Sequence, residues 1–342
     1  MDTLWAAFAR VATPQGDTYW LYFVSALAIA FIYYWLHHYG EEKVSLSGFV
    51  AFCFPKRIYT HPSAILDFKY VFLNLAVYAW LIAPLTFTSA VAAKSATTLL
   101  VDLFGIPTVP FLARGFWINL AVTVAAVIAA DVAFFISHYL QHRVAFLWEF
   151  HKVHHAAEVL HPLVQYRQHP IDTALDLVLM GSASGLVIGI SSYLSGAVVD
   201  GLTILQTNAV VFLFNVSGKH LRHSHVPVSY GPKVSRVIIS PMLHQVHHSC
   251  APPHIGKNYG GIFSLWDLLA GTLYLPRANE ELKLGLGEEG DREYRSVLRL
   301  YFLPFIKNGK GGWRLLRRVW EPRRPPSLVQ SDQGGPTSVR EL

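Results

Sequence analysis

Two near-identical pentapeptides, residues 151–155 (HKVHH) and 244–248 (HQVHH), are the strongest chemical signal in the sequence. His138 and His142 add an H-x-x-x-H pair just upstream of the first pentapeptide. Side chains three and four residues apart share a helix face, so each cluster can direct several imidazoles to one point. Neutral imidazole is the commonest metal ligand and suits iron, zinc, copper and nickel. These histidines therefore predict a site for two metal ions.

The remaining histidines have weaker patterns. Four of them are expected to be interfacial polar residues and not ligands: His37, His38, His61 and His254. His220 and His223 are three residues apart, and one of them is expected to bind metal. His225 is expected to contact the ligands without binding metal itself. His161 and His169 could each bind metal or form hydrogen bonds.

Asp131 precedes His138 by seven residues, which is two helical turns on the same face. An ionisable residue within an apolar segment indicates a functional role. We therefore expect Asp131 to accept a hydrogen bond from His138 and to fix the orientation of that ring.

The composition is typical of a membrane protein. Of 342 residues, 52% are hydrophobic and 15% are charged, whereas soluble domains have about 25% charged residues. Nine Trp and 16 Tyr suit membrane interfaces. The two cysteines form neither a disulfide framework nor a C-x-x-C pair. The net charge of +6 lies mainly near the ends of apolar runs and in the C-terminal tail, which favours a cytoplasmic membrane face over a nucleic-acid partner.

Five apolar runs are candidate spans: residues 19–36, 70–93, 116–136, 174–194 and 197–216. A kink is expected at Pro84, and the last two runs form a hairpin that brings the pentapeptides together. Lys and Arg in the short connections place the N-terminus outside, with the histidines and the C-terminus in the cytoplasm. The predicted fold is an all-α integral membrane protein with about five transmembrane helices and a cytoplasmic His-rich helical cap that holds a dimetal site.

Several chemistries are compatible with clustered histidines. A zinc hydrolase typically has an H-E-x-x-H motif, which the sequence lacks. A transporter would place its ligands in the middle of a span. A metal site that activates O2 fits best, because oxidation of an unactivated C–H bond needs a cofactor. A membrane metal-binding or transport protein and a zinc-dependent lipid hydrolase remain as alternatives.

The order of motifs across about residues 115–275 resembles the fatty acid hydroxylase/sterol desaturase superfamily. The motifs are Asp131, H-x-x-x-H-R at 138–143, L-W-x-x-H-x-x-H-H at 147–155, R-x-H-P at 167–170, H-S at 223–224, P-x-x-H-x-x-H-H-S at 241–249, N-Y-G at 258–260 and W-D…G-T at 266–272. The resemblance implies a membrane-embedded di-iron oxygenase that uses O2 and external electrons to hydroxylate, less often to desaturate, a lipid. The lipid could be a sterol, a fatty acyl chain or a polar-lipid group.

The same resemblance implies a ligand set and partners. The expected metal ligands are His138, His142, His151, His154, His155, His223, His244, His247 and His248, with His169 and His220 as possible additions. The expected cofactors are two iron ions, which zinc can replace in purified protein. Electrons are expected from a separate ferredoxin or cytochrome b5 type protein.

The expected organisation has four parts. They are an N-terminal transmembrane region (1–114), a catalytic domain (115–275), a cytoplasmic extension (276–321) and a disordered tail (322–342). Within the fourth apolar run, Gly181, Gly185 and Gly189 either permit close helix packing or leave a groove for a lipid chain.

Overall fold

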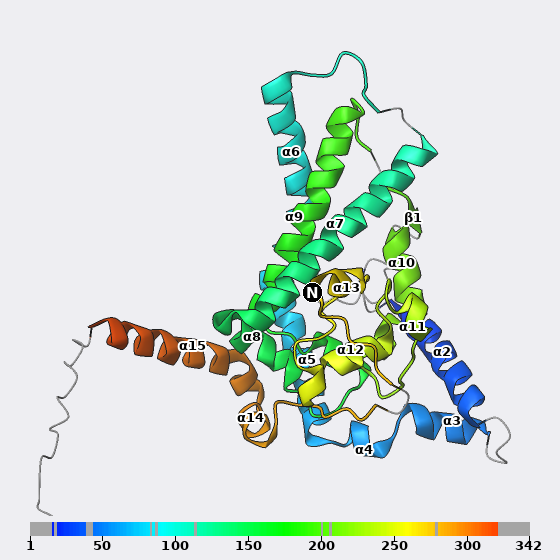
Figure 1. Cartoon of the computed structure of the whole chain (residues 1–342), viewed down its shortest axis with the longest axis vertical. Helices are drawn as coiled ribbons and strands as arrows, with labels where there is room; N and C mark the ends of the chain where they lie inside the picture. Colours follow the sequence, from blue (N-terminus) through cyan, green and yellow to red (C-terminus); the bar gives the residue numbers. More distant parts are fainter. Residues whose placement is uncertain are drawn as a thin grey trace, which may run out of the picture.

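The computed structural model describes residues 16, 19–38, 44–82, 84–85, 88–112, 115–199, 201–204, 207–277 and 280–320, so the predicted disordered tail lies outside the described residues. The fold is mostly helical, as predicted (Figure 1). The elements are α2 (Trp20–His38), α3 (Leu46–Cys53), α4 (Lys56–Tyr59), α5 (Pro62–Val77), η1 (Tyr78–Ile82), α6 (Thr88–Phe104), α7 (Phe116–Arg143), α8 (Ala145–His155), η3 (Pro162–Tyr166), α9 (Pro170–Leu194), β1 (Thr203–Ile204), β2 (Thr207–Asn208), α10 (Ala209–Val216), η4 (Lys219–His223), α11 (Gly231–Val234), α12 (Pro241–His247), η5 (Pro252–His254), α13 (Leu265–Ala270), α14 (Glu288–Glu293) and α15 (Val297–Trp320).

Three helices, α2, α7 and α9, are long and apolar enough to cross a membrane, among the residues that the structure describes. Large apolar side chains on their surfaces are exposed, for example Phe31 and Trp35 on α2 and Trp117 on α7. Contiguous exposed apolar surface of this kind is unfavourable in water and favourable in lipid. The chain is therefore a membrane protein with three candidate spanning helices.

The predicted count of five spans is not confirmed. The run at 70–93 is divided between two helical segments, because one ends at Ile82 and α6 begins at Thr88. Pro84 lies between them and has no N–H to continue a helix. The run at 197–216 is not one helix, since it forms the β1–β2 hairpin followed by the short α10. This segment returns beside α7, where Thr123 Oγ1 accepts a hydrogen bond from Leu202 N at 2.6 Å.

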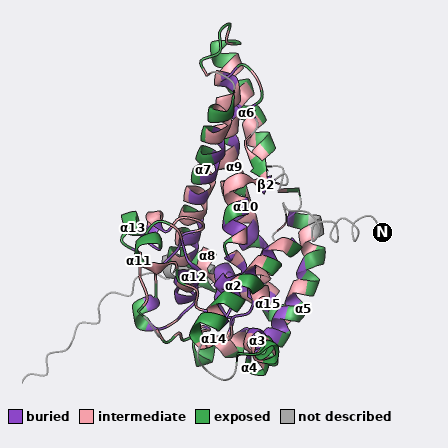
Figure 2. Cartoon of the chain, turned by 90° about the vertical axis from the view of Figure 1, so that its right-hand side faces the viewer, coloured by how far each residue is buried: buried purple, intermediate pink, exposed green. Residues whose placement is uncertain are grey.

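The helices α6, α7 and α9 pack together and extend beyond the rest of the molecule (Figure 1), with exposed and half-buried residues along their outer faces (Figure 2). A Cβ added at Gly185 would lie 2.7 Å from Ala92 Cβ, and one at Gly189 would lie 2.9 Å from Ala96 Cβ. Both distances are shorter than any ordinary van der Waals contact. Of the two alternatives for this glycine stripe, the structure therefore favours close packing of α9 against α6.

The other end of this bundle carries the histidines. The short helix α8 follows α7 after a turn at Val144, and its buried Val153 packs with Leu66 and Tyr70 of α5 and Leu300 of α15. Three helices in this region begin with a capping residue followed by proline, namely α5, α9 and α12. Proline at the first helical position fits the helix geometry and lacks an N–H that would be left without an acceptor. Of the three helices, α12 carries candidate ligands, so its cap at Ser240 defines where that histidine-bearing helix starts.

Candidate metal centre

The nine predicted ligands form two compact groups, and in each group the candidate ligand atoms lie within 4.8 Å of one another. Group one contains His138, His142, His151, His155 and His247. Group two contains His154, His223, His244 and His248. The candidate ligands come from α7, α8, η4, α12 and the C-cap of α12 at His248, so the fold brings together segments from residue 138 to residue 248. Histidines in the other positions of the described chain belong to neither group.

Each pentapeptide supplies both groups, which differs from the expectation that one cluster points to one place. His151 and His155 belong to group one, whereas His154 belongs to group two. In the second pentapeptide His244 and His248 belong to group two, whereas His247 belongs to group one. Residues four apart on a helix stay together, but adjacent residues diverge by about 100° around the axis. The two pentapeptides are therefore interlocked.

The spacing of the ring nitrogens fits metal ions. Nε2 of His138 lies 3.1 Å from Nε2 of His151, and His223 Nε2 lies 2.9 Å from His244 Nε2. For metal–nitrogen bonds of about 2.1 Å, two ligands at a right angle have nitrogens about 3.0 Å apart. Burial lowers the pKa of His151 and of His247 to about 3, which keeps both imidazoles neutral and able to ligate.

Three rings of group one are oriented through their second nitrogen. His151 Nδ1 donates to Asp172 Oδ2 at 3.0 Å. His138 Nδ1 donates to the carbonyl oxygen of Tyr259 at 2.8 Å, and His247 Nδ1 donates to that of Lys257 at 2.8 Å. Such partners fix the tautomer and leave Nε2 free to bind a metal. Asp172 was not identified from the sequence, although it follows the R-x-H-P motif by two residues.

Asp131 has a different role from the predicted one. Its carboxylate accepts hydrogen bonds from Ile262 N at 2.6 Å, Phe263 N at 2.9 Å and Trp266 Nε1 at 2.8 Å, and not from His138. Seven residues rise about 10.5 Å along a helix, too far for the two side chains to meet. Asp131 thus anchors the segment that provides the Tyr259 carbonyl oxygen, and acts on His138 only through the backbone.

Asp267 holds the same segment from the other side. Its two carboxylate oxygens accept hydrogen bonds from Tyr259 N at 2.8 Å and Gly260 N at 2.7 Å. Asn258, which precedes Tyr259, has a left-handed backbone (φ 59°). Its side-chain amide donates to the carbonyl oxygens of Leu243 and Tyr274. This explains why the N-Y-G and W-D motifs accompany the histidines, since both shape the loop beside group one.

The two possible additional ligands lie outside both groups. His169 caps α9, where its Nδ1 accepts from Ile171 N at 3.2 Å and its Nε2 donates to the Tyr301 carbonyl oxygen. His220 stacks on Phe23 with ring centroids 4.3 Å apart. His225 donates to the Phe52 carbonyl oxygen at 2.7 Å and so lies away from the nine.

A buried ion pair contacts the backbone of the first pentapeptide. Arg167 Nη1 donates to Asp67 Oδ1 at 2.7 Å, and its Nε donates to the carbonyl oxygen of Val153 at 2.9 Å. His161 Nε2 donates to the other oxygen of Asp67 at 3.0 Å. All three charged or polar side chains are buried. Because Val153 lies between His151 and His154, this network connects α5 to the backbone that positions the ligands.

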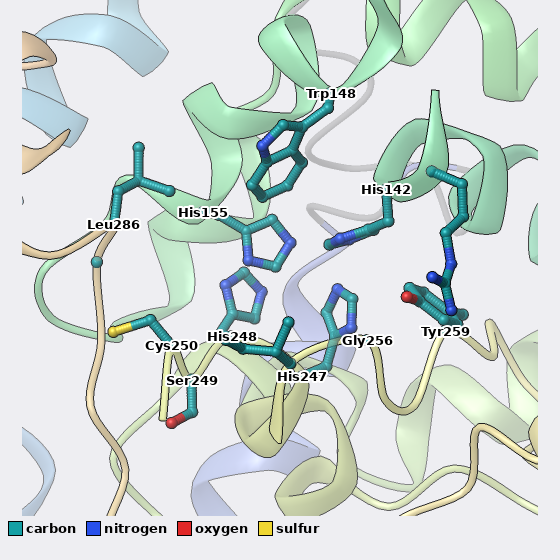
Figure 3. A pocket seen from close by; sticks show the side chains of 13 residues that line it. His142, Trp148, His155, His247, His248, Ser249, Cys250, Gly256, Tyr259 and Leu286 are labelled. Carbon is teal, nitrogen blue, oxygen red and sulfur yellow. The ribbon is translucent and has the colours of Figure 1, made fainter. Parts of the chain in front are cut away.

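A cavity of about 390 Å³ borders both groups (Figure 3). His142, His155, His247 and His248 face it, so group one and group two are both accessible from one side. Trp148, Ile255 and Leu286 give the cavity an apolar wall. The arrangement is suited to holding part of an apolar molecule next to two bound ions.

Comparisons with known proteins agree with this chemistry. Residues 123–272 match the fatty acid hydroxylase family, a stretch inside the predicted 115–275 domain. The chain is 29% identical over 187 residues to an ornithine lipid hydroxylase of Rhizobium tropici, covering 55% of this chain and 51% of that protein. It is 27% identical over 156 residues to an alkylglycerol monooxygenase of Caenorhabditis elegans, covering 46% and 28%. The human alkylglycerol monooxygenase is 26% identical over 162 residues, covering 47% and 32%.

The chain thus spans about half or less of the length of these curated relatives. No solved structure matches the chain.

Proposed function

Because the chain belongs to the fatty acid hydroxylase/sterol desaturase superfamily, we propose that it is a membrane-bound di-iron oxygenase that hydroxylates a lipid. Hydroxylation is proposed in preference to desaturation. The observation that carries the proposal is the pair of imidazole groups that border one cavity. Two iron ions bound there would supply the oxidant that attacks a C–H bond, with O2 and external electrons as co-reactants.

The protein residues would hold and orient these ions. The nine histidines provide only nitrogen donors, and Asp172 with the Tyr259 and Lys257 carbonyl oxygens fixes three of the rings. An all-imidazole site discriminates poorly between iron and zinc, so purified protein can contain zinc. Trp148 lies over His142 and His155, with ring centroids 4.9 and 5.5 Å away, and helps to keep water from that side of group one.

The proposed substrate is a polar membrane lipid oxidised at a carbon near its headgroup. The cavity is large enough for a headgroup and the carbons next to it, but not for a whole lipid. Its wall combines apolar Ile255 and Leu286 with the polar Ser249. Two of the relatives are named for ornithine lipid and for alkylglycerol. The remainder of the lipid would stay in the bilayer.

The orientation and the electron donor are also part of the proposal. Basic residues in the connections at the histidine end support a cytoplasmic position for the metal centre and the C-terminus, with the N-terminus outside. Electrons would then come from a cytoplasmic protein of the ferredoxin or cytochrome b5 type.

The test is metal analysis and O2 consumption with purified, iron-supplied protein. We expect two metal ions per chain and lipid-dependent O2 uptake, with the hydroxylated lipid identified by mass spectrometry. His247→Ala should abolish uptake and reduce bound metal. The control His254→Ala removes an equally buried histidine outside both groups, which contacts Glu280, and should keep both metals.

Other results would support other functions. One metal per folded chain would contradict the di-iron site. Two metals without O2 uptake on any lipid extract would favour a metal-binding or transport protein. Lipid hydrolysis by the zinc form without O2 would favour a hydrolase.

A further inference from the structure

The helix α15 has two different faces. One face packs on the protein, where Leu300 is fully buried and Val297, Tyr301 and Leu303 are partly buried against α5 and α8. Tyr301 also forms a hydrogen bond to Asn74 of α5, and its carbonyl oxygen accepts one from His169. The start of α15 is therefore firmly attached, while Figure 1 shows the rest of the helix extending away from the body.

The other face carries an exposed apolar stripe. Leu298 is 68% exposed, Phe302 58%, Phe305 50% and Ile306 50%. Successive positions in this stripe are four, three and one residues apart, which places them on one side of a helix. Large apolar side chains aligned in this way require a partner surface.

The charge of α15 identifies that surface. The helix contains six basic and no acidic residues. Arg299 and Lys310 are exposed and lie beside the stripe in the helical register. Lys307 lies on another side of the helix and pairs with Glu293. A helix with large apolar residues on one side and basic residues beside them is typical of segments that lie in a bilayer interface.

We propose that α15 lies along the surface of the bilayer, with this stripe at the acyl boundary and its basic residues among anionic lipid headgroups. The candidate spans α2, α7 and α9 already hold the chain in a membrane, so the lipid surface is present at high effective concentration. A protein partner would have to compete with that surface. The proposal goes beyond the oxygenase function and does not depend on the metal centre.

The test uses the full-length protein in lipid nanodiscs, with an environment-sensitive fluorophore on Phe302→Cys in a Cys250→Ser background; Cys53 is buried. In discs of phosphatidylcholine with phosphatidylglycerol, we expect a blue-shifted emission and several-fold stronger quenching by spin-labelled lipid than by iodide. The matched control is Glu289→Cys on α14, which is exposed and lies outside α15. Its label should be quenched by iodide.

A charge variant provides the second arm. One basic residue near an anionic surface contributes about 1 kcal/mol, or about a fivefold change in equilibrium. Arg299→Gln with Lys310→Gln should therefore lower the insertion equilibrium of the label about 25-fold in anionic discs, and much less in neutral discs.

Two results would overturn the proposal. The first is iodide quenching of the Phe302→Cys label in anionic discs as strong as that of the Glu289→Cys label. The second is protection of the label in detergent that rises with protein concentration, which would mean that a second copy of the chain covers the stripe.

Discussion

The substitution Asp172→Asn should weaken the binding of a metal ion at group one and leave binding at group two unchanged. The carboxylate of Asp172 accepts from Nδ1 of His151, a group-one ligand, at 3.0 Å, and both side chains are buried. The substitution keeps the shape but replaces the carboxyl acceptor by an amide, which can turn its NH2 group toward the ring and no longer fixes the His151 tautomer. Loss of such a partner typically reduces metal affinity about 10- to 100-fold, or about 1.4–2.7 kcal/mol. His151 does not belong to group two.

The assay is metal retention during competition with a graded series of chelator concentrations. Wild type should lose its two ions at higher chelator concentrations, whereas Asp172→Asn should pass through a plateau near one ion per chain. Circular dichroism and size-exclusion chromatography on the same samples would show that the one-metal protein remains folded.

A matched variant makes the result specific. Asp176 lies one turn further along α9, and its Oδ1 accepts from Ser137 at 2.6 Å and Gln141 at 3.0 Å, not from a histidine. Asp176→Asn should therefore retain both ions at the chelator concentration that removes one from Asp172→Asn. If both ions left Asp172→Asn together, or if the two variants behaved alike, the reasoning from the single Asp172–His151 contact would be refuted.

Three further substitutions test the supports of the site and the bundle. Asp131→Asn leaves one oxygen where the carboxylate accepted three hydrogen bonds, and should lower the free energy of unfolding by about 3 kcal/mol in denaturant titrations; retention of wild-type stability would contradict the anchoring role. Asp67→Asn leaves the buried Arg167 without its counter-ion and should destabilise by about 3–5 kcal/mol in the same titrations, and a loss below about 1 kcal/mol would mean that the pair is dispensable. Gly185→Ala forces a methyl group against α6 and should lower the melting temperature through about 1–3 kcal/mol of overpacking. Its control Gly311→Ala meets no atom within 4 Å and should leave that temperature equal or higher, so equal behaviour of the two variants would argue for a groove.

The sequence predicted well which histidines lie close together, because their signal is local. Spacings of four residues, as in His138 and His142, determine which imidazoles can meet, and all nine expected residues lie in the two groups. The division of His154 and His155 between the two groups needed the structure, since only the relative placement of the helices shows which imidazoles converge.

The hydrogen bonds and ion pairs that hold the histidine-bearing segments were less predictable, because they join residues far apart in the chain. Asp67 and Arg167 are 100 residues apart, and nothing in either local sequence indicates the partner. Asp131 was expected to accept a hydrogen bond from His138 but bonds to Ile262, Phe263 and Trp266, because periodicity gives a direction around a helix and not a partner along it. The fifth apolar run was expected to be one span but forms the β1–β2 hairpin and the short α10, because average apolarity does not register polar residues such as Asn208, which caps the start of α10.

The interlocking of the two pentapeptides has a consequence for biogenesis. Each group takes histidines from both residues 151–155 and residues 244–248, so in the proposed di-iron protein neither ion would be fully bound before the ribosome has completed the second pentapeptide. Iron insertion would accordingly follow the placement of α9 and the returning segment, and each ion would then act as a cross-link that closes a long loop. Because either ion alone still joins the two pentapeptides, the loss of one would leave the segments tied together, and a half-loaded protein could regain its missing ion without unfolding.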